Sequence, residues 1–185
     1  VARLFVRHGE RIAATGLDYP AHEVNFEQSI VAPAALVLLE LHHLTGQARW
    51  LDAALPHVEL LDRFEGCQPE YHLNGVAIRH WDGYWFGKDE LWGDTFPHYW
   101  STLNALAWGL MAHATGDPAW QRRATTTMRA NLTQFGTDGT ATAAFVYPMT
   151  VNGREAHRPD PYANDQDWTL VFHHDLREWA APSYF

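Results

Sequence analysis

The distribution of apolar and polar residues along this chain predicts two kinds of helix. Between Ile30 and Leu41 the only charged residue is Glu40. A helix that is apolar on every side is normally buried on every side, so we expect an interior helix over about residues 26–44. A second apolar stretch, over about residues 96–114, predicts another helix of the same kind.

Each predicted interior helix is followed by a segment with a single apolar face. In the second case the apolar residues recur every three or four positions, as Trp120, Ala124, Met128, Leu132 and Phe135. The same spacing occurs earlier in the chain, as Trp50, Ala54, Val58, Leu61 and Phe64. This period is typical of an amphipathic helix that packs one side on a core. Asp117 and Pro118 fit the N-cap and the first position of the later helix.

The two helix pairs belong to one internal repeat. Thr45, Gly46 and Trp50 recur 70 positions later as Thr115, Gly116 and Trp120. The further pairs with the same offset are Phe26 with Phe96, Asp82 with Asn152 and Gly83 with Gly153. We expect Gly46 and Gly116 to end the interior helices, because glycine accepts the positive φ of a C-terminal cap. A fixed period of this length indicates a repeat architecture.

Each helix pair is followed by a segment typical of strands. Residues 76–81 and 84–86 flank Asp82-Gly83, and residues 149–151 precede Asn152-Gly153. Asp-Gly and Asn-Gly favour the tight turns of β-hairpins. We expect a third interior helix to begin near residues 165–167. Residues 1–15 resemble an outer helix whose interior partner would lie upstream.

Alternating interior and outer helices predict an all-α fold, a partial (α/α) toroid of about three helical hairpins with inserted β-hairpins. The units, together with residues 81–85 and 93–100 (WDGYW and GDTFPHYW) and residues 22–28, resemble the six-hairpin glycosidase superfamily. The resemblance is nearest to glycoside hydrolase family 154 β-glucuronidases and unsaturated glucuronyl hydrolases. A full ring has six hairpins, so we expect residues 1–185 to be one domain and a C-terminal piece of a longer ring.

The resemblance implies a cleft at the N-terminal ends of the interior helices. Three carboxylates lie near those expected ends, and we expect them to be catalytic: Glu27 (or Glu23), Asp94 and Asp165 (or Asp167). Glycoside hydrolysis uses a pair of carboxyl groups, one as acid and one as base or nucleophile. Acidic residues at helix starts also serve simply as caps. Thr95 offers an alternative cap before Pro97, which leaves Asp94 available for chemistry.

The nine Trp, seven Tyr and nine Phe either fill the core or stack on sugars. Trp50, Trp108 and Trp120 occupy expected core positions. The candidate substrate-binding residues are those around the expected cleft: Trp81, Trp85, His80, His98, Tyr99, Trp100, Arg79 and Lys88. Arg79 or Lys88 would pair with a uronate carboxylate, and exposed salt bridges are the alternative for both.

The twelve histidines form no metal motif. His42-His43 and His173-His174 are helix neighbours that point to different faces, so we expect neither pair to chelate a metal. With no paired cysteines and no His-Glu-x-x-His, we expect no metal site, and no nucleotide motif indicates a cofactor.

The net charge of −9 argues against a nucleic-acid partner. No segment is long and apolar enough to cross a membrane, and no signal peptide is visible, which slightly favours the cytoplasm. Cys67 is the only cysteine, which is compatible with a reducing compartment.

The sequence therefore predicts a glycoside hydrolase that acts on glucuronide-containing oligo- or polysaccharides. One alternative is a sugar isomerase, epimerase or lyase on the same fold, in which His80, His98 and His173 would move protons. Another is a non-catalytic, glycan-binding half-toroid. Because the end faces of half a ring would expose apolar surface, we expect a homodimer or dependence on the missing half.

Overall fold

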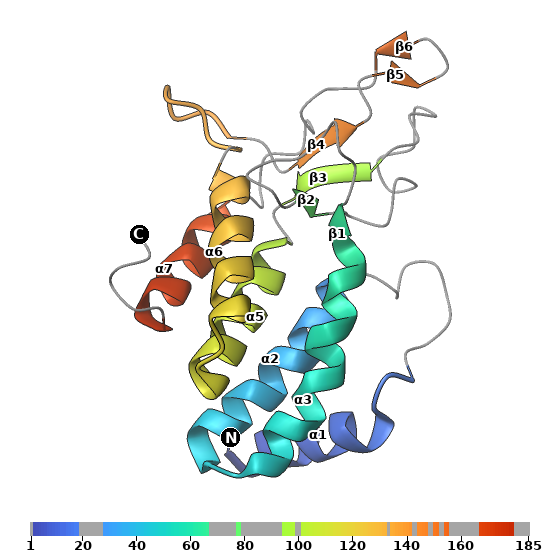
Figure 1. The fold of residues 1–185 in the computed structure, drawn as a ribbon, viewed down its shortest axis with the longest axis vertical. Coiled ribbons are helices and arrows are strands. Elements are labelled where there is room, and N and C mark those ends of the chain that lie inside the picture. The colour runs from blue at the N-terminus through green and yellow to red at the C-terminus, as the bar shows by residue number, and fades with distance from the viewer. Residues whose placement is uncertain are drawn as a thin grey trace.

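The computed structural model consists of α-helices with short strands gathered at one end (Figure 1). It describes residues 2–18, 28–66, 77–78, 94–98, 101–132, 134–141, 144–147, 150–151, 154–155 and 167–179. The helices are α1 (Ala2–Thr15), α2 (Gln28–Thr45), α3 (Ala48–Leu60), α5 (Ser101–Thr115), α6 (Pro118–Leu132) and α7 (Asp167–Trp179), with a 3-10 turn η1 (Leu61–Phe64) after α3. The prediction of an all-α fold is confirmed.

The 70-residue repeat is a repeat of hydrogen bonds as well as of sequence. The Thr45 hydroxyl donates to the Leu41 carbonyl at 2.6 Å, and the Gly46 N–H donates to the His42 carbonyl at 2.7 Å. In the second unit, Thr115 donates to Met111 and Gly116 to Ala112, both at 2.7 Å. The glycine φ angles are 66° and 72°. The predicted C-terminal glycine caps are therefore confirmed, and each turn sends the chain straight into an antiparallel outer helix.

The outer helices begin and pack as the sequence predicts. Asp117 accepts a hydrogen bond from the Ala119 N–H at 2.8 Å, so it is the N-cap of α6. Trp50 is 1% exposed and Trp108 is fully buried, as expected for core residues. Trp120 is only partly buried, because it packs on the edge of the core with Arg123 over its ring at 5.3 Å. The prediction that Trp120 is a core residue is thus only partly correct.

The interior helices α2, α5 and α7 lie side by side and run in the same direction (Figure 1). In the middle of this row, every residue of α5 from Ser101 to Ala112 is buried. In α2, over residues 31–45 where burial is described, the buried positions are Val31, Ala32, Ala35, Leu38, Leu39 and Leu41. Pro33 is exposed and Leu36 and Val37 are half-buried, so the expectation of all-round burial holds for α5 and is wrong for α2. The reason is position in the row, since α5 has a helix on both sides.

Helix α1 lies across the ends of α2 and α3 (Figure 1). Phe5, Val6 and Ile12 pack on the core, and Gly9 is buried where α1 crosses Leu41 and Trp50. A Cβ at position 9 would contact the Leu41 side chain and lie 3.4 Å from the Trp50 ring. The predicted helix over residues 1–15 is therefore present, and glycine allows it to approach closely.

The described strands form three antiparallel pairs. They join β1 (Glu65–Gly66) to β2 (Ala77–Ile78), β3 (Asp94–His98) to β4 (Ala144–Tyr147), and β5 (Thr150–Val151) to β6 (Arg154–Glu155). In the last pair Val151 is opposite Arg154, which confirms the predicted pairing of these strands, and the connecting Asn152-Gly153 lies outside the described residues. The turn predicted at Asp82-Gly83 lies outside the described residues.

The start of the second interior helix differs from the prediction. The helix was expected from about residue 96, but residues 94–98 form β3 and α5 begins at Ser101. Pro97 explains the difference, because the residue before a proline is driven into extended conformations. Thr95 lies opposite Val146 in the strand pair, so its expected role as a helix cap is wrong.

The cap at Gly116 provides a test of the repeat turn. The position has a positive φ, and nothing lies within 4 Å of an added Cβ, so a substitution tests backbone strain alone. We expect Gly116→Ala to lower the free energy of unfolding by about 1 kcal/mol, and Gly116→Asn by less, because Asn tolerates this region. Chemical denaturation measures both. Equal stability of Gly116→Ala and the wild type would contradict the assigned turn.

His57, on α3, provides a pH test. It is 1% exposed, and burial lowers its pKa below the ordinary value of 6.5. The unfolded chain therefore takes up the proton more readily, and stability is lost as the pH falls from about 6.5 towards the lowered pKa of the folded state. We expect His57→Gln to flatten the dependence of the unfolding free energy on pH between pH 7.5 and 5.5. The exposed His8→Gln is the control and should keep the wild-type slope.

Candidate functional site

Most of the predicted site residues lie outside the described part of the chain. These are Glu27, Asp165, Arg79, His80, Trp81, Trp85, Lys88, Tyr99 and Trp100. Asp94 and His98 are placed by their backbone, at the two ends of β3. In the sequence, Glu27 directly precedes α2 and Asp165 comes two positions before α7.

Strand β3 carries Asp94 and His98 towards the start of α5. Asp94 is opposite Tyr147 and His98 is opposite Ala144 in β4, with an irregularity in the register between Thr95 and His98. Asp94 was predicted to lie at the start of the helix. It lies instead in a strand that precedes that helix in the chain. His98 is closer to the terminus, three positions before Ser101.

The first turn of α5 is polar although it is completely buried. Ser101, Thr102 and Asn104 are each 0% exposed. The Ser101 hydroxyl and both amide atoms of Asn104 have no hydrogen-bond partner among the residues that the structure describes. Buried polar atoms in proteins are almost always satisfied by protein, ordered water or ligand. This turn therefore offers neutral donors and acceptors, which suit hydroxyl-rich ligands and the waters that accompany them.

Similar groups occupy the neighbouring helix ends. Asn131, in the last turn of α6, is 0% exposed and donates from its amide nitrogen to the Thr127 carbonyl at 3.0 Å. Its amide oxygen has no partner within the described ranges. Thr169, in the first turn of α7, is also fully buried, and its hydroxyl is likewise unpaired there. The end of α6 and the starts of α5 and α7 lie at the end of the bundle where the strands gather (Figure 1).

We call these five buried residues, Ser101, Thr102, Asn104, Asn131 and Thr169, the polar end of the bundle. The backbone N–H groups at the starts of α5 and α7 add a positive partial charge there, which favours anionic ligands. These residues were not among the candidates predicted from the sequence, which are charged, aromatic or histidine residues. The available signal was Ser-Thr-x-Asn at the start of an otherwise apolar helix.

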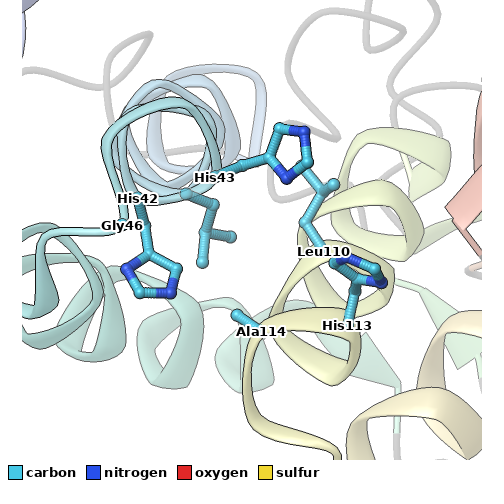
Figure 2. A pocket seen from close by; sticks show the side chains of 7 residues that line it. His42, His43, Gly46, Leu110, His113 and Ala114 are labelled. Atoms are coloured by element: carbon cyan, nitrogen blue, oxygen red, sulfur yellow. The ribbon is translucent and has the colours of Figure 1, made fainter.

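The opposite end of the same helices holds a groove of about 250 Å³ (Figure 2). His42, His43 and His113 line it, with Leu39, Leu110 and Ala114. His42 and His43 both line the groove, and their side chains leave α2 in different directions, as expected of helix neighbours (Figure 2). Among the described residues, no three His, Cys, Asp or Glu side chains come together as a metal-binding group, and no helix could span a membrane.

Comparison with solved structures gives an informative match. No family model and no curated protein matches the chain. A solved structure of a polysaccharide lyase is similar, with a TM-score of 0.80 and 46% sequence identity over 95% of this chain. This chain spans 26% of the length of that lyase. The similarity extends to both repeat units, so the fold and much of its sequence are shared with a quarter of the larger protein.

The two buried asparagines form a matched pair for testing the polar end. Asn131 makes a hydrogen bond to a backbone carbonyl, whereas the Asn104 amide has no described partner. We expect Asn131→Leu to lower the free energy of unfolding by about 1 kcal/mol, because a hydrogen bond is lost. We expect Asn104→Leu to leave the free energy of unfolding unchanged or to raise it, because this variant removes a buried amide that has no described hydrogen-bond partner. Denaturant titration measures both. A loss in Asn104→Leu as large as that in Asn131→Leu would show that the Asn104 amide is satisfied in the folded protein.

Proposed function

We propose that this chain is part of a polysaccharide-degrading enzyme, and that the enzyme is a lyase. The observation that supports this is the 46% identity, with a TM-score of 0.80, to a quarter of a polysaccharide lyase. At this identity over nearly the whole chain, common ancestry is the natural explanation. We therefore favour the lyase hypothesis over the hydrolase hypothesis that the sequence alone favoured.

The repeated hairpins support a further part of the proposal. Three parallel interior helices, with α3 and α6 antiparallel outside them, form an arc that further hairpins would extend into an (α/α) ring. In that arrangement the starts of α2, α5 and α7 would line the ring's cleft. The polar end of the bundle would then lie beneath the substrate.

The proposed substrate is a uronate-containing polysaccharide. A lyase takes the C5 proton beside the uronate carboxyl group with a base. The C4–O bond then breaks, its electron pair leaves with the oxygen, which gains a proton, and a C4–C5 double bond forms. This reaction consumes no water and needs a general base near neutral pH, for which histidine is suited. In this chain His98, in β3 before α5, and His80 are the candidates that we propose for proton transfer.

The alternative within the same substrate class is hydrolysis by a carboxylate pair. Asp94 favours this candidate, since it lies in the same strand as His98 and leads into the same helix. With Glu27 or Asp165 it would provide the acid and base of a glucuronidase. Arg79 or Lys88 would bind the uronate carboxylate in either reaction, and Trp81, Trp85, Tyr99 and Trp100 would stack on sugar rings.

A product assay distinguishes the two reactions. The full-length protein is incubated with uronate-containing polysaccharides in H₂¹⁸O, and the ultraviolet absorbance of unsaturated uronate and the ¹⁸O content of new ends are measured. A lyase produces the absorbance and leaves the original oxygen on the anomeric carbon of the new reducing end. A hydrolase puts ¹⁸O on that carbon and produces no absorbance. We expect His98→Ala to lower turnover by at least tenfold, as removal of a general base does.

Two variants complete this experiment. Asp94→Asn should lose activity only if the carboxylate takes part, and His8→Ala, exposed on α1 at the other end, should keep wild-type turnover. Labelled reducing ends together with full loss in Asp94→Asn would replace the lyase proposal by the hydrolase. Binding of polysaccharide with neither product would contradict both and favour a glycan-binding protein.

A further inference from the structure

The groove lined by His42, His43 and His113, here called the histidine groove, lies away from the polar end of the bundle. It plays no part in the proposed reaction. It lies between the C-terminal ends of α2 and α5, where the repeat turns at Gly46 and Gly116 reverse the chain (Figure 2). His43 and His113 are repeat equivalents, 70 positions apart, one on each helix. Their ring centroids are 6.1 Å apart, and the ring planes meet at 63°. Two imidazoles from different helices thus converge on one small space.

The surroundings of these rings favour a cation. The C-terminal end of a helix carries a negative partial charge from its last carbonyl groups, and here two such ends lie side by side. The chain as a whole has a net charge of −9. Leu39, Leu110 and Ala114 add apolar side chains to the groove, and Gly46 completes its lining.

The third histidine of the groove, His42, has a backbone contact of its own. The Nδ1 atom of His42 lies 3.1 Å from the Gln47 carbonyl oxygen, which can only accept a hydrogen bond. Nδ1 therefore carries the proton when the ring is neutral, and the lone pair is on Nε2. Histidines that bind metals are usually oriented by this kind of contact. Imidazole is a preferred ligand of Zn²⁺, Ni²⁺ and Cu²⁺.

We propose that His43 and His113 bind one divalent transition-metal ion in this groove, with water in the remaining coordination positions. Two protein ligands make it an open surface site, which links the interior helices of the two repeat units. A metal that binds only when both helices are in place stabilises the folded protein. The site is independent of the proposed lyase reaction.

The experiment uses the full-length protein with CuCl₂, because Cu²⁺ has the highest affinity in the divalent series and its electron paramagnetic resonance spectrum reports bound nitrogens. The wild type is compared with His43→Ala, His113→Ala and the double variant, and with His8→Ala as a control for other histidines. Both groove positions are exposed, so the variants should fold, and equal melting temperatures in EDTA would verify this.

We expect the wild type and His8→Ala to bind one more Cu²⁺ ion than the double variant, with two nitrogen ligands for that ion. Each single variant should show one nitrogen and at least tenfold weaker binding. With free Cu²⁺ at 100 times the dissociation constant, the folding equilibrium should shift about 100-fold towards the folded state, and the double variant should lose this shift. Equal stoichiometry and equal spectra in the wild type and the double variant would overturn the proposal.

Discussion

The burial of α5 on all sides is the constraint on which the rest of the structure depends. Every residue from Ser101 to Ala112 is buried, and Trp108 is fully buried. Such a helix needs neighbours on all sides, and α2, α6 and α7 provide them. The turn at Gly116 keeps α6 antiparallel against it, and Arg123 of α6 lies 5.9 Å from the Trp108 ring while pairing with Asp62 of η1. One arginine thereby connects the second repeat unit to the end of the first.

The same burial gives the polar residues of α5 their significance. An amide or hydroxyl that is removed from water without a partner costs free energy, of the order of 1–3 kcal/mol in proteins. A helix selected only for packing would carry alanine or leucine at positions 101 and 104. The presence of Ser101 and Asn104 there is thus expected where a ligand, or water beside a ligand, satisfies them. Local rules of stability are most often broken at functional sites.

The sequence predicted the repeated parts of the fold better than the connections between them. Thr45-Gly46 and Thr115-Gly116 form the same hydrogen bonds because short-range chemistry alone determines a helix cap, and the pairing of β5 with β6 is local in the same way. The strand at residues 94–98 was missed because its partner, β4, lies about 50 positions later in the sequence. The groove lined by His42, His43 and His113 was missed for a similar reason, since it forms only where α2 packs against α5, two helices far apart in the sequence.

The candidate site was predictable in location but not in composition. The repeat places the starts of three interior helices at one end, and the resemblance to sugar-processing enzymes implied a cleft there, so carboxylates and aromatics near those starts were the natural candidates. A charged residue stands out in a sequence, whereas Asn104 becomes notable only when its complete burial is known. The two ends of the helices differ in how the chain connects one helix to the next. At one end, two-residue turns close each hairpin and leave a small groove between helix ends. At the other, the long connections between hairpins enter and leave the bundle, which is where repeat folds carry their variable, ligand-binding segments.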